Sequence, residues 1–450
     1  MRSDHDAARE GTTIAAATPA DVQLQTRSGQ TGKGRVLFVT SSFPRWVGDS
    51  TTPFVLHLAQ DLQQMGWAVH VVAPHAPGAQ TRERLEGIEV ERFRYLWPES
   101  AQTVCYSGGA LINLRRNRWN YLKVPALVAS EFSKVLVRLA GRSFDLVHSH
   151  WIIPQGFVAG VASRITNVPH VATVHGGDIY ALRGPVTTRF KKAAFGLADV
   201  VTVNSSATCD AVRAAVPNLR KLVRIPIGAS GPARDFAEEA GDIRVRFRNG
   251  DGPLLVFVGR LVEEKGVDDL LQAIRILAQT RPNTTALIIG EGQERRELEA
   301  LAVQLGVADR VTFTGWVDPA RIHAHMAAGD VFIGPSKRSR DGWQEGQGLT
   351  FVEAMLAGTP VIATDCGGIH DVVRNEHTGL IVRERAPAEI VGAIERLTDD
   401  HELADRLRAS ALAFAADGFT RSASARRFSE IYADLIASHP DRRRPMLGPS

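Results

Sequence analysis

The stretch LLVFVGRLVEEKGVDDLLQAIRILA, residues 254–278, carries the pattern that decides the fold. Leu254–Val258 is a continuous apolar run of strand length, which is typical of a strand buried on both faces. Gly259 permits a turn, and Val267–Ala278 then has the apolar spacing of a helix that covers a sheet. A strand of this kind followed closely by a helix predicts one unit of a parallel α/β sheet.

The same unit recurs in both halves of the chain. Apolar runs alternate with helical patterns from Arg35 onward, stop over 228–252, and restart at residue 253. The interrupting stretch is rich in Gly, Ala, Asp, Glu and Arg and is predicted to be a linker. The chain of 450 residues is therefore predicted to form two Rossmann-like, doubly wound α/β domains that face each other across a cleft.

The ends of the chain differ from this pattern. The first residues are polar and aperiodic, and the last are basic and contain proline, so neither end is predicted to join a domain. The predicted order is a disordered leader over 1–33, an N-terminal domain over 34–227, the linker over 228–252, a C-terminal domain over 253–414, a helix over 415–438 and a tail over 439–450.

Composition excludes several classes of protein. An apolar content of 44% and a charged content of 23% are those of a soluble globular protein, and no apolar run approaches the length of a transmembrane helix. The first ten residues include acids and lack the apolar segment of a secretory signal. The three cysteines are far apart, which favours a reducing cytoplasm over disulfides or a cysteine metal site. The net charge of +4 indicates anionic partners only weakly.

Residues 345–353, EGQGLTFVE, form the most distinctive polar stretch. Glu345 and Glu353 bracket seven residues that pass from a glycine-rich loop into a helix beginning near Gly348. The free N–H groups and the positive dipole end of such a helix suit an anion such as a diphosphate. On spacing alone, a solvated acidic loop followed by an ordinary helix glutamate is an equal alternative.

Two cations, Arg260 and Lys265, lie in the strand-to-helix loop quoted first. Arginine can bind two phosphate oxygens at once, and lysine acts as a point charge. A surface loop of scattered charge is the alternative, because Glu263 and Glu264 lie between the cations. The next strand ends in a turn formed by Gly290, Glu291 and Gly292. This turn can hold a flat base against backbone groups, and the alternative is a plain tight turn.

Polar residues also end strands of the first half. His175 is followed by Gly-Gly and Asp178, so it is predicted to face a ligand, where it can bind a hydroxyl or stabilise charge. The alternative is that His175 is a buried histidine of the core without a ligand. His150 ends another strand, and without further ligands nearby it indicates acceptor-site lining or structure rather than metal. Gly48 and Asp49, in the loop after the first strand, can touch an acceptor or a phosphate.

The stretch Leu111–Arg142 is basic and amphipathic. Such a surface can lie on an anionic membrane, whereas a solvated basic face on a packed helix is the alternative. Its cations, which alternate with aromatic and aliphatic residues, are Arg115, Arg116, Arg118, Lys123, Lys134, Arg138 and Arg142.

Five motifs taken in order resemble retaining glycosyltransferases of family 4, which adopt the GT-B fold of two Rossmann-like domains. The motifs are HGGD (175–178), GRLVEEKG (259–266), GEG (290–292), EGQGLTFVEA (345–354) and AGTPVIAT (357–364). The resemblance covers roughly residues 35–400. The first loop, GDSTTPF, departs from the Gly-Gly pair of many relatives but is similar to that of exopolysaccharide and lipid-linked glycan enzymes, so its role stays open.

The resemblance implies a role for each matched residue, and it implies that the C-terminal helix crosses back to the N-terminal domain. The cations would bind the donor diphosphate, Glu345 the donor sugar and Glu353 the ribose. His175 would contact the sugar near the reacting centre, and the GEG turn would lie beside the base. Backbone amides would complete the phosphate site at Gly348, Leu349 and Thr350.

The implied reaction moves a hexose-type sugar from a UDP- or GDP-sugar to a glycan or lipid-linked acceptor. Arg260, Lys265 and the helix start would stabilise the leaving diphosphate. No second carboxylate is evident for a covalent intermediate, which favours front-face attack with retention. No cofactor or metal is expected beyond the nucleotide diphosphate sugar, because the cations neutralise the diphosphate.

Two other functions fit the same motifs. One is a GT-B epimerase or phosphorylase, and the other is a non-catalytic nucleotide-sugar binding protein. A dehydrogenase is disfavoured, since no G-x-G-x-x-G follows the first strand. The expected location is the cytoplasm, either free or peripheral on the cytoplasmic face of the membrane, with no nucleic-acid partner. The sequence leaves the base, the sugar and the acceptor open.

Overall fold

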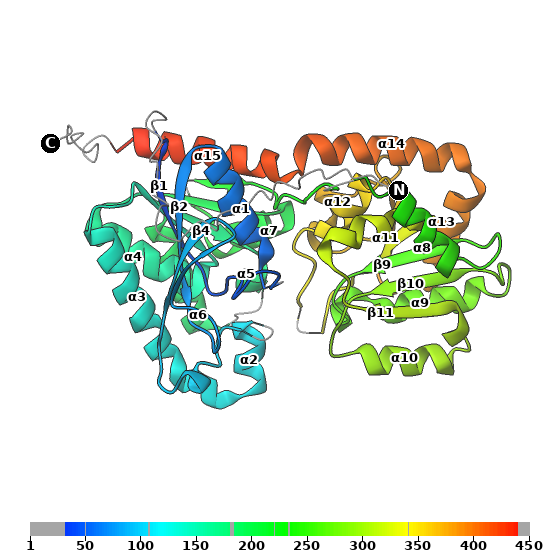
Figure 1. Cartoon of the computed structure of the whole chain (residues 1–450), viewed down its shortest axis with the longest axis horizontal. Coiled ribbons are helices and arrows are strands. Elements are labelled where there is room, and N and C mark those ends of the chain that lie inside the picture. The colour runs from blue at the N-terminus through cyan, green and yellow to red at the C-terminus, as the bar shows by residue number, and fades with distance from the viewer. Residues whose placement is uncertain are drawn as a thin grey trace, which may run out of the picture. The chain divides into compact units, whose positions relative to one another are not determined.

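A computed structural model describes residues 32–439 apart from 50, 107–108, 181–183, 220, 233–234 and 341 (Figure 1). Of the predicted leader and tail, only Gly32, Lys33 and His439 fall within the described residues. The described chain forms two Rossmann-like α/β domains, which confirms the predicted fold class.

The N-terminal domain is built on an eight-stranded sheet with the order β3-β4-β2-β1-β5-β6-β7-β8. Only β3 runs antiparallel to its neighbour. Its strands are β1 Gly34–Val39, β2 Trp67–Pro74, β3 Arg82–Leu85, β4 Ile88–Phe93, β5 Leu146–His150, β6 His170–Val174, β7 Val200–Val203 and β8 Leu222–Arg224.

Helices cover both faces of this sheet. One apolar cluster joins α1 to β1 and β2, and a second joins α3 and α4 to the opposite face. The helices of the N-terminal domain are α1 Pro53–Gln64, α2 Ala110–Arg116, α3 Val124–Ala140, α4 Phe157–Thr166, α5 Gly177–Tyr180, α6 Pro185–Leu197 and α7 Ser206–Ala215.

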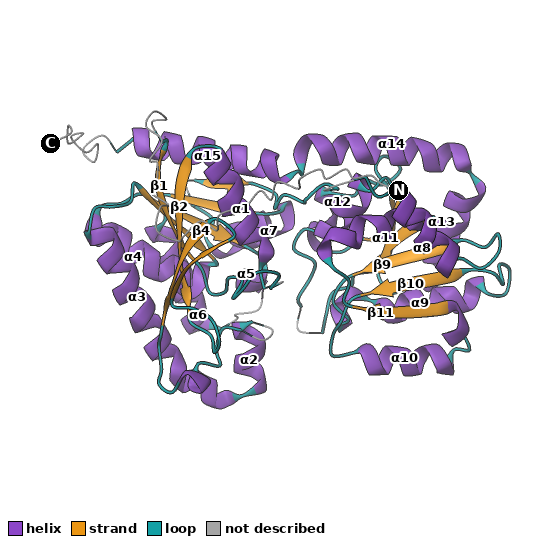
Figure 2. Ribbon diagram, in the orientation of Figure 1, coloured by secondary structure: helices purple, strands orange, loops and turns teal. Residues whose placement is uncertain are grey.

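The C-terminal domain contains a six-stranded parallel sheet with the order β11-β10-β9-β12-β13-β14. Figure 2 shows its strands as orange arrows flanked by purple helices. The strands are β9 Leu254–Val258, β10 Thr285–Ile289, β11 Val311–Gly315, β12 Val331–Gly334, β13 Val361–Thr364 and β14 Leu380–Val382. The helices are α8 Ala237–Phe247, α9 Val267–Leu277, α10 Arg295–Gln304, α11 Ile322–Ala328, α12 Leu349–Leu356, α13 Pro387–Asp399 and α14 His401–Gly418.

Helix α8 lies inside the stretch predicted as a linker, 228–252, so that prediction was wrong for its second half. Ala240 and Ile243 are buried in the C-terminal core, and the Arg244 guanidinium donates to the carbonyl of Ala328 at 2.8 Å. The many charged residues of this helix lie on its other face and hid its short apolar stripe.

The last helix, α15 (Arg421–Ala437), belongs to the core of the N-terminal domain. Phe428, Tyr432 and Leu435 join the apolar cluster around β1 and β2. Trp67 donates its indole N–H to Ser429 Oγ at 2.9 Å. The single helix predicted over 415–438 is broken before α15, because Thr420 Oγ1 caps its start by accepting from the Ala423 N–H.

The basic stretch Leu111–Arg142 is not one exposed surface. Lys134 and Arg138 of α3 pair with Glu91 of β4 at 3.1 and 2.5 Å. Burial raises the pKa of Glu91, but these two cations outweigh it and lower that pKa to about 2. The second half of the stretch therefore stabilises the fold, and only its first half remains as a candidate membrane surface.

Candidate active site

Glu345 lies at the centre of a polar cluster formed by the loops that follow β9 and β12. Its carboxylate is buried and lies 2.5 Å from the Lys265 ammonium, and Ser336 Oγ donates to the same oxygen at 3.4 Å. Burial raises the pKa of Glu345, but Lys265, Arg260 and the Gly346 N–H outweigh it and hold that pKa below its usual value. Glu345 is therefore ionised at neutral pH.

Arg260 supplies a second cation beside this carboxylate. Its side chain is 58% exposed, and its ion pair to Glu264 is long, at 3.7 Å. Arg260 and Lys265 both lower the pKa of the Glu345 carboxyl. The structure thus brings together the two cations and the carboxylate that the sequence singled out. The exposed guanidinium of Arg260 is accessible to an anion.

Helix α12 begins next to this cluster. Gly348 adopts a left-handed conformation with φ of 83°, which suits glycine, and a Cβ there would lie 2.7 Å from the Phe351 ring. No side chain of the described residues caps the helix, so the N–H groups of Leu349 and Thr350 lack a side-chain acceptor. The helix start can thus accept an anion.

Glu353 lies one turn further along α12 and is partly exposed. Its carboxyl group itself is desolvated by the surrounding protein, which raises the pKa of that group to about 7. Across the described ranges, the structure records no hydrogen bond or ion pair of this side chain. Glu345 and Glu353 therefore differ: one carboxylate is fixed and charged, and the other is free and easily protonated.

The GEG turn packs against the loop that carries Arg260. A Cβ on Gly290 would lie 2.0 Å from the Gly259 carbonyl oxygen, and one on Gly292 would lie 2.1 Å from that of Leu261. Glu291 pairs with Arg295 at 2.5 Å, and its carbonyl accepts from the Leu261 N–H at 3.0 Å. The two glycines are needed for this close backbone contact.

His175 is held in an aromatic surrounding at the end of β6. Its Nε2 lies 3.1 Å from His150 Nδ1, and the Phe54 and Trp151 rings lie 5.0 and 4.8 Å from its ring. Burial lowers the pKa of His175 to about 3. Its Nδ1 is buried without a hydrogen-bond partner in the described part of the chain. A neutral imidazole with one free nitrogen can bind a hydroxyl but carries no charge.

The residues predicted on the acceptor side are used by the fold. Asp178 is buried, and its two oxygens accept from the N–H groups of Ile152 and His175 at 2.8 and 3.2 Å. Asp49 accepts from the Arg45 guanidinium at 2.7 Å and from Thr51 Oγ1 at 2.9 Å. Both carboxylates therefore hold loops in shape, and the acceptor role expected of them stays a prediction.

The other two acceptor-side residues differ in exposure. His150 is almost fully buried, and burial keeps its imidazole neutral by lowering the pKa well below its usual value. Its Nδ1 lies 3.1 Å from His175 Nε2, so His150 contacts the imidazole of His175 rather than solvent. Gly48 is exposed, and its φ of 81° favours glycine, whereas a Cβ there would meet no described atom within 4 Å.

Gln347 belongs to this site and was not predicted. It is buried, its Oε1 accepts from the Ile227 N–H at 2.7 Å, and its Nε2 donates to the Ile227 carbonyl at 2.9 Å. The neighbouring Gly346 approaches the other domain too, since a Cβ there would lie 3.4 Å from the His175 carbonyl oxygen. The only indication of a role for Gln347 in the sequence is that this polar residue lies between two glycines, Gly346 and Gly348.

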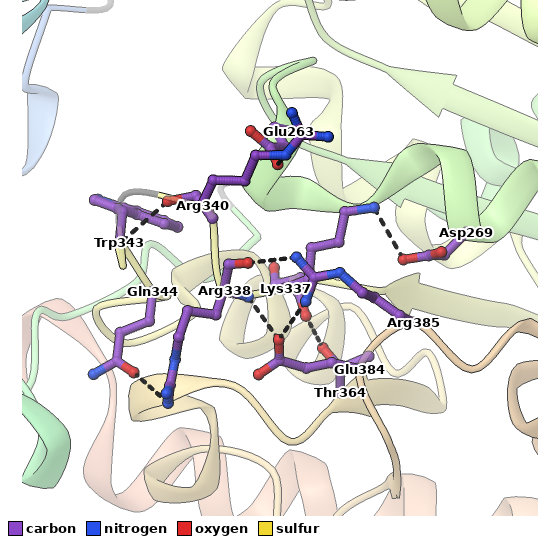
Figure 3. Close-up of polar contacts among 12 residues, drawn as sticks. Glu263, Asp269, Lys337, Arg338, Arg340, Trp343, Gln344, Thr364, Glu384 and Arg385 are labelled. Carbon is purple, nitrogen blue, oxygen red and sulfur yellow. Dashed lines mark hydrogen bonds and ion pairs between the residues drawn. The ribbon is translucent and has the colours of Figure 1, made fainter.

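Lys337 was also missed, and it anchors the loop between β12 and α12. Its ammonium lies 2.6 Å from Asp268 and 3.2 Å from Asp269, both in the first turn of α9. Figure 3 shows Lys337 reaching towards Asp269 while Arg338 extends to Gln344. The loop that ends at Glu345 is thus fixed at its base.

Comparisons with known proteins identify the family of the chain. The sequence pattern described as "Glycosyl transferases group 1" matches residues 240–413, and that described as "Glycosyltransferase Family 4" matches residues 52–229. A 2-deoxystreptamine glucosyltransferase of Streptomyces kanamyceticus is 31% identical over 274 residues, which cover 57% of this chain and 68% of that protein.

A second relative is a GDP-mannose-dependent alpha-(1-6)-phosphatidylinositol monomannoside mannosyltransferase of Mycobacterium tuberculosis. It is 34% identical over 255 residues, which cover 56% of this chain and 65% of that protein. The matched stretch thus spans about two thirds of either relative.

Solved structures share the fold. HepE of Anabaena in complex with UDP has a TM-score of 0.70 at 21% identity, over 89% of this chain and 100% of that one. Sucrose-phosphate synthase of Thermosynechococcus elongatus has a TM-score of 0.72 at 22% identity, over 90% and 99%. From its motifs, its fold and these relatives, the chain belongs to the family 4 glycosyltransferases of the GT-B fold.

Proposed function

We propose that the protein transfers a hexose-type sugar from a nucleotide diphosphate sugar to a glycan or lipid-linked acceptor, with retention of the anomeric configuration and without a metal ion. The observation that carries this proposal is the ion pair between Lys265 and the buried Glu345, with Arg260 and the uncapped start of α12 beside it. These groups provide positive charge and N–H donors in one place, next to a carboxylate that stays ionised.

The donor's parts fit different groups of this cluster. The diphosphate would bind Arg260, Lys265 and the N–H groups at the start of α12, where the helix dipole also favours negative charge. The free carboxylate of Glu353 would accept from the ribose hydroxyls, and Glu345 would orient the sugar. As the bond to phosphate breaks, the cations would stabilise the leaving diphosphate and Glu345 the positive charge on the anomeric carbon.

Retention by front-face attack is supported by the state of Asp178. This carboxylate lies three positions after His175 in the sequence, and backbone N–H groups donate to both of its oxygens. It is therefore poorly suited to act as a nucleophile, and the neutral His175 is suited to bind a sugar hydroxyl. An attacking acceptor would then lose its proton to the leaving phosphate on the same face.

Independence of metal is proposed because Arg260 and Lys265 can neutralise the diphosphate. Within the described residues, no group of three or more His, Cys, Asp or Glu side chains is placed to hold a metal ion. UDP- and GDP-sugars both remain candidate donors, since one relative is named for GDP-mannose and one similar fold was solved with UDP.

Removing either cation should abolish most of the transfer, and removing the ribose carboxylate should weaken donor binding. Arg260→Ala and Lys265→Ala are expected to lower kcat about 100- to 1,000-fold through lost charge stabilisation. Glu353→Ala should mainly raise KM, and Arg296→Ala, an exposed arginine of the same domain, should change neither. The assay is transfer from a panel of UDP- and GDP-sugars with and without acceptor and EDTA, with the product's anomeric configuration read by NMR.

Wild-type rates in all three site variants would show that the reaction does not use this cluster. An inverted product would exclude front-face retention, and complete loss with EDTA would exclude metal independence. Conversion of the donor sugar without any acceptor would indicate an epimerase instead.

Donor binding should depend on pH through Glu353. Only the ionised carboxylate makes a charge-assisted bond to the ribose hydroxyls, and its pKa is about 7 in the free protein. The affinity for a nucleotide sugar should therefore rise by up to about tenfold between about pH 6 and about pH 8. Isothermal titration calorimetry should find this rise absent in Glu353→Gln; identical pH profiles for the two proteins would contradict the assigned role.

We also propose that the segment 112–123, which includes most of α2, contacts an anionic membrane when a lipid-linked acceptor is used. No helix of the described chain is long and apolar enough to cross a bilayer. The segment instead presents exposed apolar side chains next to cations: Trp119 is 73% and Leu122 72% exposed, beside the exposed Arg116 and Arg118. Aromatic residues with arginines suit the interface of an anionic bilayer.

Vesicle pelleting tests this surface. The double variant Arg116→Gln/Arg118→Gln should bind phosphatidylglycerol-containing vesicles about 30-fold more weakly, at about 1 kcal/mol per charge. Wild-type binding should also weaken at high salt and on pure phosphatidylcholine. The control Arg426→Gln/Arg427→Gln removes two exposed arginines of α15 and should bind normally. Equal binding by both double variants would refute the proposed surface.

A further inference from the structure

We propose that Asp371 is a positioning residue that holds the Glu345 loop against the N-terminal domain for catalysis. It closes the 3₁₀ turn Gly367–Asp371 that follows β13 in the C-terminal domain. The Asp371 side chain is only 10% exposed. This inference rests on the proposed glycosyl transfer and adds to it a residue outside the donor-binding cluster.

All three recorded donors to Asp371 come from the other domain. The Ser206 N–H donates to one carboxylate oxygen at 2.5 Å, and Ser206 Oγ donates to the other at 2.9 Å. The Arg224 guanidinium at the end of β8 donates to that second oxygen at 2.5 Å. One carboxylate thus receives a backbone N–H, a hydroxyl and a guanidinium.

The position of Ser206 makes this contact stronger than a surface ion pair. Ser206 is the first residue of α7, whose N-cap Ser205 accepts from the Thr208 N–H at 3.2 Å. The Ser206 N–H is one of the donors that a helix start leaves without an internal acceptor. A carboxylate there satisfies that donor and also meets the positive end of the helix dipole.

The other end of the same turn is packed against Glu345. The Gly368 N–H donates to the Glu345 carbonyl oxygen at 2.9 Å. Gly367 has a φ of 60°, and a Cβ there would lie 2.2 Å from that oxygen. A Cβ on Gly368 would lie 2.1 Å from the Gly346 carbonyl oxygen and 2.7 Å from Ser205 Cβ. The turn has no free space between the Glu345 loop and the start of α7.

A rigid connection therefore runs from α7 through Asp371 and the two glycines to the backbone of Glu345. The same loop reaches His175, since Gly346 approaches the His175 carbonyl oxygen. Loss of the Asp371 contacts would let the donor-side loop move away from the strand ends of the N-terminal domain. The donor would still bind, because Arg260, Lys265 and Glu353 belong to the C-terminal domain alone.

The test compares the variant Asp371→Ala with the control variant Asp365→Ala. Asp365 is an exposed aspartate directly after β13, and it pairs with His370 of its own domain at 2.6 Å. In Asp371→Ala, kcat should fall about 10- to 100-fold, as expected for misplaced reacting groups, while the Kd for the nucleotide sugar stays within about twofold. Asp365→Ala should match the wild type in both. Arg224→Ala should lower kcat less, and adding it to Asp371→Ala should cause no further loss, because it acts through that carboxylate.

Hydrogen–deuterium exchange of the full chain provides a readout that is independent of turnover. The start of α7, residues 205–209, should exchange faster in Asp371→Ala than in the wild type, and only the wild type should gain protection there when UDP or GDP is added. Unchanged kcat, unchanged exchange, or a parallel loss of donor affinity would each overturn the proposal. If the wild type transfers no sugar at all, the proposed function fails, while the exchange experiment still decides the role of Asp371.

Discussion

The ion pair between Lys265 and the buried Glu345 is the interaction on which the site depends. A buried carboxylate is costly unless a cation and hydrogen bonds compensate it, so the loops after β9 and β12 must meet where these side chains do. Other contacts keep that meeting point fixed. Lys337 ties one loop to the first turn of α9, and the GEG turn supports the other through close backbone contacts at Gly290 and Gly292.

The ion pair also explains why two glutamates eight positions apart behave differently. Glu345 faces two cations and stays charged, whereas Glu353 on α12 is desolvated by burial and its pKa rises to about 7. Spacing alone shows two carboxylates, but it does not show which one is compensated. A site that holds one fixed and one free carboxylate can position a sugar with the first and exchange hydroxyl partners with the second.

The sequence predicted the parallel strands well because they are buried on both faces and read as continuous apolar runs. Leu254–Val258, for example, was predicted with the bounds that the structure has. The hairpin of β3 and β4 was missed because arginines and glutamates interrupt its apolar pattern. Helix α8 was missed for the same reason, and the break before α15 depends on the Thr420 cap, which a periodic pattern does not reveal.

The residues of the site can also be divided into those that the sequence reveals and those that it does not. Arg260, Lys265 and Glu345 were singled out because they lie in loops that lead into helices, and the structure brings the three side chains together. Asp49 and Asp178 were assigned to the acceptor by the same reasoning, and that assignment stays a prediction, while the structure shows that guanidinium and backbone donors bind them. Gln347 and Asp371 were missed because their partners lie in the other domain, more than a hundred positions away. Local spacing carries no information on such contacts.

The most direct measurement is a crystal structure of the protein with a UDP- or GDP-sugar bound. The account predicts the diphosphate within hydrogen-bond distance of Arg260, Lys265 and the N–H groups of Leu349 and Thr350, with the ribose on Glu353 and the sugar between Glu345 and His175. A nucleotide sugar bound with its diphosphate away from both cations and from the start of α12 would contradict the account.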